Sequence, residues 1–267
     1  CAGYPKYDQV TGLLSFNRFR EEVDSVIASG KGKSCLLVYT DLENFKYFNR
    51  KYGYAAGDQL LREFTGYIID TLKKRNTAHF TRVVADQFIL FFEEKWNNGS
   101  IEAIKRINNG FIERQQRKYP EAKLRLRTGV YKVEKDCDGA SFAIDAANYA
   151  RRQIQDNSPE TVCVYDKTMA DLQNMENEIA IGLDKAIKNK EFKIYLQPRF
   201  SLTTGKIVGA ESLVRWQRED GTILPPDSFI PVYEKNGRII DLDFYMFEET
   251  VKLLANWKEQ GIPQRLI

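Results

Sequence analysis

The chain has 267 residues, 43% of them apolar, which is enough for a sizeable core in one large domain or two of ordinary size. The 40 Lys and Arg residues are nearly balanced by 37 Asp and Glu residues, so the net charge is only +3. That balance argues against an extended surface for nucleic-acid polymers, which needs clustered basic charge. No run approaches the roughly 18 apolar residues of a membrane span, and no signal peptide is visible, so no membrane contact is expected.

The cysteine and histidine content limits which cellular compartment and which kinds of metal or catalytic site are expected. The four cysteines, at positions 1, 35, 137 and 163, show no short paired spacing. Those at 35 and 163 lie in apolar runs, as small buried residues do. A reducing, cytoplasmic location is therefore expected, with a membrane anchor outside this segment left open. The single histidine, His79, argues against a histidine-based metal site or a catalytic triad.

Residues 1–166 have the pattern of one α/β domain with a central sheet and flanking helices. In chain order we expect a helix from Ser15 to about residue 28, a strand over 34–40, helices over 45–51 and about 56–72, a hairpin whose tight turn carries Asp86 and Gln87, a helix near 101–111, a strand over 124–133, a helix capped by Ser141, and a strand over 161–165.

Three carboxylates of this domain have both a structural and a functional interpretation. Asp41 stands at the carboxyl end of the first buried strand, where α/β proteins tend to bind ligands, so it can hold a cation with Glu43 nearby. Asp58, expected in the first turn of a helix, is favoured there by the helix dipole alone. Asp86 in the hairpin turn is either a solvated turn residue or a ligand aimed into a site.

The remaining residues predict a connector with a linking helix over 167–190 and an incomplete domain over 191–267. The expected linking helix runs from about 172 to 188. The expected elements of the incomplete domain are a strand over 192–196 ended by Gln197-Pro198, a strand over 207–216, a loop from Pro225-Pro226, a helix from about 241 to 259, and a strand-like run from Gln264. Three or four elements after residue 190 cannot enclose a core of their own size, so we expect the opening third of a larger domain.

Glu211 and Arg215 are charged residues inside an otherwise apolar strand. Buried charges are costly unless they are paired or bind a metal. The period of two residues places both on one side of the strand. They either form an ion pair, or bind a cation at Glu211 and an anion at Arg215.

The first half of the chain resembles a GGDEF (diguanylate cyclase) domain throughout. The matching segments are Asp8-Gln9-Val10-Thr11-Gly12-Leu13, Asp41-Leu42-Glu43-Asn44-Phe45-Lys46-Tyr47-Phe48-Asn49, Gly53 to Asp58, and the signature Val84-Ala85-Asp86-Gln87-Phe88. The resemblance implies that Asp41 and Asp86 hold divalent ions, Mg²⁺ or Mn²⁺. It also implies that Asn49 and Asp58 recognise guanine. Lys46 and Arg151 complete the nucleotide site that the resemblance implies.

The departures from the GGDEF pattern bear on activity. Both signature glycines, which let backbone approach the phosphates, are replaced, by Val84 and Ala85. The fourth signature residue is Gln87 instead of an acid, and the product-inhibition motif at 75–78 lacks its Asp. Arg151 stands where the family usually has a phosphate-binding Lys. We therefore expect no cyclase activity and retain GTP binding as a regulatory hypothesis.

From about residue 172 the chain resembles the start of an EAL phosphodiesterase domain, a (β/α)8 barrel. The matching segments are Tyr195-Leu196-Gln197-Pro198, Gly209-Ala210-Glu211-Ser212-Leu213-Val214-Arg215-Trp216 and Pro225 to Pro231. The resemblance implies that Glu211 is a metal ligand and that Gln197 and Arg215 contact cyclic di-GMP. Together the two halves resemble a tandem GGDEF–EAL protein of cyclic di-GMP signalling.

The resemblance leaves two functions open. In the first, the intact parent hydrolyses cyclic di-GMP to linear pGpG by metal-activated water in its EAL half, and the GGDEF half regulates it. In the second, both halves are degenerate and form a non-catalytic nucleotide-sensing or protein-interaction module. If the 267 residues are all there is, they lack a closed barrel and would fold by exchange with another chain. A homodimer and an upstream sensor domain are further expected partners.

Overall fold

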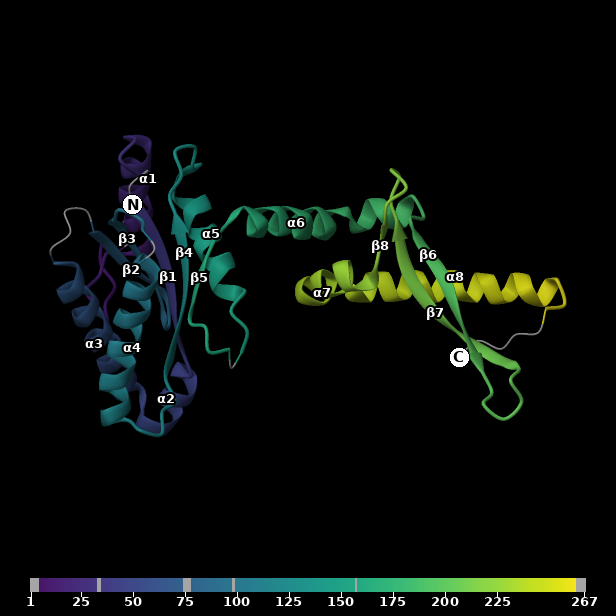
Figure 1. Ribbon diagram of the computed structural model, residues 1–267, viewed down its shortest axis with the longest axis horizontal. Coiled ribbons are helices and arrows are strands. Elements are labelled where there is room, and N and C mark those ends of the chain that lie inside the picture. The colour runs from purple at the N-terminus through teal and green to yellow at the C-terminus, as the bar shows by residue number, and fades with distance from the viewer. Residues whose placement is uncertain (1–4, 33–34, 74–77, 98, 157, 263–267) are drawn as a thin grey trace. The chain divides into compact units, whose positions relative to one another are not determined.

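The computed structural model describes residues 5–32, 35–73, 78–97, 99–156 and 158–262. The chain divides into two units, Cys1–Ala170 and Asp171–Ile267, and each is described by itself. In Figure 1 the first unit is a sheet covered by helices on both faces, and the second is a long antiparallel hairpin packed against helices. Within the described residues, no helix combines the length and apolar character needed to cross a membrane.

The first unit alternates helices and strands in the order that the sequence predicts. Its elements are α1 (Phe16–Ala28), β1 (Cys35–Glu43), α2 (Phe45–Tyr52), α3 (Tyr54–Leu72), β2 (Ala78–Val84), β3 (Gln87–Glu93), α4 (Ser100–Lys118), β4 (Arg125–Lys132), α5 (Gly139–Arg152) and β5 (Val162–Val164). The predicted order and the α/β class are therefore confirmed.

These strands form one five-stranded sheet in the order β2-β3-β1-β4-β5. The central strand β1 pairs antiparallel with both β3 and β4, and β5 pairs parallel with β4. Residues 35–40 of β1 are all buried, because helices cover both faces of the sheet. This double burial is the reason for the continuous apolar run in the sequence.

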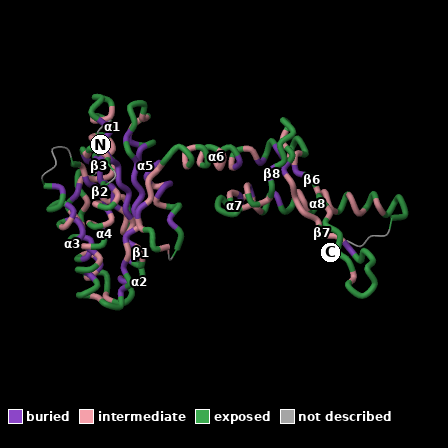
Figure 2. Tube along the Cα trace, viewed as in Figure 1, coloured by how far each residue is buried: buried purple, intermediate pink, exposed green. Residues whose placement is uncertain are grey.

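Two hydrophobic cores lie on the two faces of the sheet, and successive residues of β1 alternate between them. Val38 belongs to the core that includes Phe64 of α3. The next residue, Tyr39, belongs to the opposite core, which includes Phe19 of α1 and Ala147 of α5. Figure 2 shows the resulting buried stripe along the strands, with exposed residues on the outer sides of the helices.

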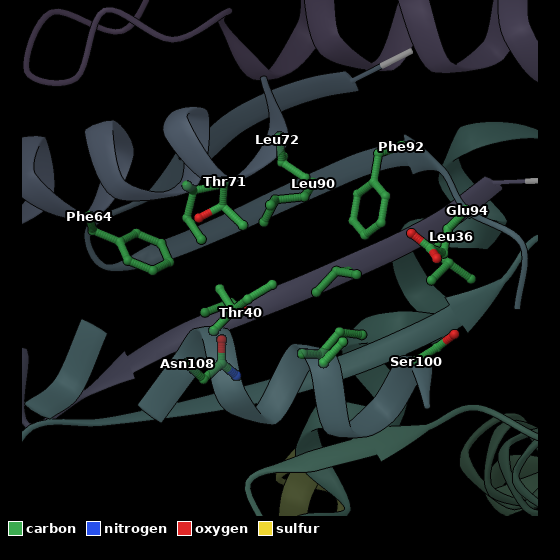
Figure 3. A pocket seen from close by; sticks show the side chains of 15 residues that line it. Leu36, Thr40, Phe64, Thr71, Leu72, Leu90, Phe92, Glu94, Ser100 and Asn108 are labelled. Carbon is green, nitrogen blue, oxygen red and sulfur yellow. The ribbon is translucent and has the colours of Figure 1, made fainter. Parts of the chain in front are cut away.

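A cavity of about 60 Å³ remains in the first core, between the sheet, α3 and α4 (Figure 3). Its walls are mainly apolar, and a polar network closes one end. The hydroxyl oxygens of Thr40 in β1 and Thr128 in β4 lie 2.8 Å apart, and Asn108 Nδ2 of α4 donates to Thr128 Oγ1 at 2.8 Å. These buried polar groups thereby find partners, and the network ties α4 to the two central strands.

The β2–β3 hairpin turns over two residues, Ala85 and Asp86, because Val84 pairs with Gln87. The prediction that Gln87 belongs to the turn is therefore wrong, since this residue begins β3. Ala85 has a φ of 48°, in the left-handed region, where tight hairpins usually place glycine. The hairpin thus keeps a glycine-type backbone conformation although its sequence has no glycine there.

Two helices of the first unit begin before their predicted positions. Helix α5 begins at Gly139 instead of Ser141, because Asp24 of α1 accepts a hydrogen bond from the Ala140 N–H at 2.6 Å. Helix α3 begins at Tyr54, so the prediction that Asp58 lies in its first turn is wrong. The helix dipole acts mainly within that turn, and it does not account for this carboxylate.

The second unit packs a small sheet against helices. Its elements are α6 (Lys167–Lys188), whose first residues belong to the first unit, β6 (Phe192–Phe200), β7 (Ile207–Gln217), β8 (Ile223–Leu224), α7 (Pro226–Asn236) and α8 (Ile239–Glu259). The sheet order is β6-β7-β8, with antiparallel pairing. Trp216 lies at the centre of the core with Phe192 and Phe229, and its indole N–H donates to Glu191 Oε2 at 2.8 Å.

Three boundaries in this part of the chain differ from the prediction. Helix α6 begins at Lys167, well before residue 172, because Asp166 Oδ1 accepts the Met169 N–H at 2.9 Å as an N-cap does. Strand β6 continues through Pro198, which an edge strand tolerates because its outer N–H groups need no partner. Pro226 starts helix α7 instead of a loop, since proline suits the first helical position. The run predicted from Gln264 lies outside the described residues.

Candidate functional site

A polar cleft lies at the carboxyl end of β1, where the sequence predicts a ligand site. Strand β1, helix α2, the β2–β3 turn and strand β4 all contribute to its walls. The lining residues include Asp41, Glu43, Lys46, Tyr47, Arg50, Asp86, Lys123, Arg125, Arg127 and Asp156. The structure therefore brings three of the predicted site residues, Asp41, Lys46 and Asp86, into one cleft.

Asp86 faces the cleft, half-buried, beside the charge of Asp41. The backbone holds the turn against β1, because the Leu42 N–H donates to the Asp86 carbonyl oxygen at 3.1 Å. Burial, and secondly the negative charge of Asp41, raise the pKa of the Asp86 carboxyl to about 6. Two nearby carboxylates with this mutual repulsion form a place where a cation is favoured.

Arg151 reaches the same place from the last turn of α5. Its Nη1 lies 3.2 Å from Asp41 Oδ2, and its guanidinium lies over the Tyr39 ring, 5.4 Å from the ring centre. The close approach of α5 depends on Gly129 in β4. A Cβ on this residue would lie 1.9 Å from the Ala147 carbonyl oxygen and 2.5 Å from the Arg151 nitrogen. Glycine is therefore required for Arg151 to reach Asp41.

Gln87 takes part in the packing behind the cleft. Its Oε1 accepts a hydrogen bond from the Tyr39 hydroxyl at 2.7 Å. The strand register also sets Gln87 opposite Asp41. Burial raises the pKa of the Tyr39 phenol, so this hydroxyl remains a donor at neutral pH. The amide at this position thus fixes the tyrosine beneath Arg151.

Asn49 and Asp58 come from α2 and α3, and neither is among the residues that line the cleft. Gly57 allows the two helices to touch, since a Cβ there would lie 1.9 Å from Asn49 Oδ1. Asn49 Oδ1 is buried and accepts no hydrogen bond from the described residues. The packing of Gly57 encloses this oxygen and leaves its hydrogen-bonding capacity unused within the described residues.

Two basic residues that local sequence patterns do not place at the site also line the cleft. Arg125 and Arg127 in β4 lie opposite Glu43 and Asp41 of β1, so their side chains share the cleft face. The period of two in the sequence places both arginines on one side of their strand. The pairing of β4 with β1 is a long-range contact, and no local pattern shows it.

In the second unit, Gln197 of β6 and Glu211 of β7 are direct cross-strand partners. Glu211 is exposed, so the expectation that its strand position is buried is wrong. Arg215 donates to the Val214 carbonyl oxygen at 2.7 Å and lies over the Tyr195 ring at 5.7 Å. Both charges are described, and no ion pair joins them. The ion-pair alternative is therefore wrong.

Metal ligands are few within the described ranges, which contain no group of three or more His, Cys, Asp or Glu side chains arranged to hold a metal ion. Asp41 and Asp86 nevertheless fit Mg²⁺ or Mn²⁺. Magnesium is commonly bound through one or two carboxylates plus the phosphates of a substrate. Both carboxylates line one cleft, and the negative charge of Asp41 acts on Asp86, so a positive ion between the two groups is favoured.

Comparison with known families settles the class of the chain. The family described as "Diguanylate cyclase, GGDEF domain" matches residues 5–159, and the EAL domain family matches residues 182–267. The chain belongs to the tandem GGDEF–EAL family. The first unit is therefore its GGDEF unit and the second its EAL unit, and the resemblance inferred from the motifs is confirmed.

The relatives span both activities of this family. The cyclic di-GMP phosphodiesterase PdeR of Escherichia coli is 26% identical over 97% of this chain and 39% of its own length. The bifunctional diguanylate cyclase/cyclic di-GMP phosphodiesterase MucR of Pseudomonas aeruginosa is 21% identical over 93% of this chain and 36% of its own length. The chain thus spans well under half the length of these curated relatives.

Solved structures agree on the fold. The S helix-GGDEF-EAL structure of Vibrio cholerae LapD, bound to c-di-GMP, has a TM-score of 0.54 and 16% identity, covering 98% of this chain and 60% of that one. The GGDEF domain of DgcB from Caulobacter crescentus, in complex with c-di-GMP, has a TM-score of 0.51 and 17% identity, covering 62% and 98%. At these identities the likeness concerns the fold.

The GGDEF signature occupies the hairpin turn described above. Its second glycine position is Ala85, which keeps the left-handed φ, whereas its first is Val84, an exposed residue at the end of β2. Its third position is Asp86 in the cleft, and its fourth is Gln87. The degenerate product-inhibition motif at 75–78 lies almost wholly outside the described residues.

Proposed function

We propose that the GGDEF unit binds GTP with a divalent ion, makes no cyclic di-GMP, and regulates an EAL domain that hydrolyses cyclic di-GMP. The observation that carries the first part is the Asp41–Asp86 pair in the cleft, with the pKa of Asp86 raised to about 6. The matches to the GGDEF and EAL families support a role in cyclic di-GMP signalling.

Guanine recognition is supported by Asn49. Its buried Oδ1 accepts no hydrogen bond from described residues, and the N–H groups of guanine are donors that it would accept. Asp58 follows Gly57 on the facing helix and supplies a second acceptor at the same helix pair. Lys46 on α2 adds positive charge on the cleft side of that helix. When bound, a divalent ion on Asp41 and Asp86 would neutralise phosphate charge.

Loss of cyclase activity is supported by the signature turn. The side chains of Val84 and Ala85 occupy the positions where glycine would let a phosphate approach the backbone. The acid at the fourth position is replaced by Gln87, which is engaged with the Tyr39 hydroxyl. The turn therefore has a left-handed position at Ala85 and lacks an acid at the fourth signature position.

The EAL half is proposed as the enzymatic part of the longer protein. Gln197 and Glu211 face each other across β6 and β7, so a cation at Glu211 would lie beside an amide for the dinucleotide. Glu211 supplies one carboxylate, which fits a divalent ion only with further ligands from elsewhere in the domain. Arg215 lies four residues after Glu211 on the same strand, and its guanidinium supplies a positive charge for a phosphate of the dinucleotide.

GTP binding is tested by isothermal titration calorimetry of the chain with GTP and Mg²⁺, with ATP as the comparison nucleotide. We expect saturable heat with GTP, weaker binding of ATP, and about tenfold weaker GTP binding for Asn49→Ala, since one buried hydrogen bond is lost. Absence of heat with GTP removes the nucleotide-binding part of the proposal.

Hydrolysis is tested on the longer protein that contains this chain, with cyclic di-GMP and Mg²⁺ or Mn²⁺. We expect linear pGpG as the product, and loss of activity in Glu211→Gln. Glu219→Gln, an exposed carboxylate of the same unit, is the matched control and should leave the rate unchanged. If the unmodified protein produces no pGpG, the non-catalytic sensing module becomes the better account. The expected homodimer and upstream sensor domain stay predictions for that same protein.

A further inference from the structure

Arg125 and Arg127 form a basic wall of the cleft on strand β4. The antiparallel register sets Arg127 opposite Asp41 and Arg125 opposite Glu43. Side chains of directly paired residues point to the same face of a sheet. The two guanidinium groups therefore stand beside the carboxylates that would hold a divalent ion, on the side of the cleft away from the signature turn.

Both arginines are held in place by partners that leave them charged and oriented. Glu43 forms ion pairs with both, at 3.6 Å to Arg125 Nε and at shorter range to Arg127. Arg125 also donates to the carbonyl oxygens of Ser158 and Glu160, the latter at 2.7 Å. Their side chains are only 22% and 16% exposed, respectively. Such oriented guanidinium groups match the geometry of phosphate oxygens.

Asp156 is the exception among these partners. It forms an ion pair with Arg127, yet its own side chain is 87% exposed. Exposed ion pairs contribute little free energy, typically below about 1 kcal/mol, so this carboxylate can be displaced. Arg127 Nε is also enclosed and donates no hydrogen bond to the described residues. A phosphate group, with more charge and more acceptor oxygens than a carboxylate, would compete well for Arg127.

Five basic residues of the cleft face four carboxylates, so the cleft suits a polyphosphate once divalent ions neutralise the carboxylates. Lys46, Arg50 and Lys123 line it together with the two arginines. Bound divalent ions would add further positive charge near Asp41 and Asp86. At the signature turn, by contrast, the side chain of Ala85 takes the space that glycine would leave for a phosphate.

We propose that Arg125 and Arg127 form the phosphate subsite of this GGDEF unit, where they bind the polyphosphate of a nucleoside triphosphate after displacing Asp156. The proposal rests on the proposed GTP binding and names the part of the cleft that holds the phosphates. Asp156 then acts as an internal competitor that lowers the affinity for nucleotide.

The test is calorimetry of the chain with two probes, GTP and inorganic tripolyphosphate, both with Mg²⁺. Asp156→Asn removes the competitor and should tighten binding of both probes by up to about fivefold. Arg127→Gln should weaken binding of both by about tenfold or more, because a charge-assisted contact is lost. Glu21→Gln, an exposed carboxylate on α1 with the same change in net charge, should leave both affinities unchanged.

Each outcome decides one of the two proposals. If GTP binds but neither variant changes its affinity, the arginine subsite is overturned and GTP binding stands. If tripolyphosphate binds with the expected pattern and GTP does not bind, the subsite stands and the proposed GTP function fails. Binding of neither probe overturns both. Because Asp156 is exposed, Asp156→Asn decides the matter even if Arg127→Gln fails to fold.

Discussion

At the scale of single residues, the GGDEF signature of this chain keeps one left-handed backbone position and lacks both glycines and the fourth acid of the GGDEF pattern. Ala85 occupies a left-handed conformation, and Asp86 still points into the cleft. Gln87 supports Tyr39, and Arg151 lies between that ring and Asp41. These contacts surround the carboxylate pair, and the proposal of nucleotide binding without cyclase activity rests on them.

The left-handed φ of Ala85 predicts an unusual effect of restoring glycine. Ala85→Gly should raise the free energy of unfolding by about 1 kcal/mol, because the Cβ strain at φ 48° disappears. Val84→Gly, at the neighbouring signature position in β2, should lower it by about 1 kcal/mol, since glycine is unfavourable within a strand. Urea denaturation followed by circular dichroism measures both, and equal signs for the two variants would contradict the assigned backbone.

The raised pKa of Asp86 predicts a pH-dependent stability. The folded state favours the protonated carboxyl, so its contribution to stability is present below the unfolded pKa and is lost as the pH rises through about 6. In metal-free buffer, Asp86→Asn should therefore be more stable than the unmodified chain at pH 7 and above, by about 1 kcal/mol after allowance for solvent screening.

This gap should shrink as the pH falls through about 6 and close near pH 4. Urea denaturation at a series of pH values measures it. Asp70→Asn removes an exposed carboxylate on α3 and is the control for the loss of one negative charge. A gap for Asp86→Asn that stays constant from pH 4 to pH 8 would exclude the burial and repulsion inferred for Asp86.

At the scale of elements, local patterns predict the order of helices and strands but not how the strands pair. The continuous apolar run of β1 and the stripe of α3 are visible in the sequence because burial sets their periodicity. Start points that depend on a distant or unexpected cap, such as Asp24 for α5, are not visible. The sequence predicts the part of the cleft that β1 forms. It does not predict the part formed by Arg125 and Arg127, because their place depends on the pairing of β4 with β1.

The position of Arg151 depends on the close packing of α5 against β4 at Gly129. Gly129→Ala would place a Cβ 1.9 Å from the Ala147 carbonyl oxygen, so α5 must move away from β4. We expect the free energy of unfolding to fall by about 2 to 3 kcal/mol. Gly66→Ala is the matched control, because its Cβ meets nothing within 4 Å and lies within helix α3.

For Gly66→Ala we expect a gain of up to about 1 kcal/mol, from helix propensity. Chemical denaturation of the two variants and the parent chain gives both values. If Gly129→Ala proves as stable as the parent chain, α5 does not pack on β4 as closely as described, and the contact between Arg151 and Asp41 loses its structural basis.

At the scale of the whole molecule, two units with separate cores carry the two halves of one signalling family. The GGDEF unit contains the five-stranded sheet and the polar cleft at the carboxyl end of β1. The EAL unit contains the strand pair with Gln197 and Glu211. This division predicts that nucleotide binding is a property of the present chain, and that hydrolysis belongs to the longer protein.

The most direct measurement of the central claim is to incubate the chain with GTP and Mg²⁺ and to determine bound and converted nucleotide in one sample. Equilibrium dialysis gives the bound fraction, and chromatography of the same sample gives the products. We predict bound GTP that is recovered intact, with no cyclic di-GMP. Formation of cyclic di-GMP, or absence of bound GTP, would contradict it.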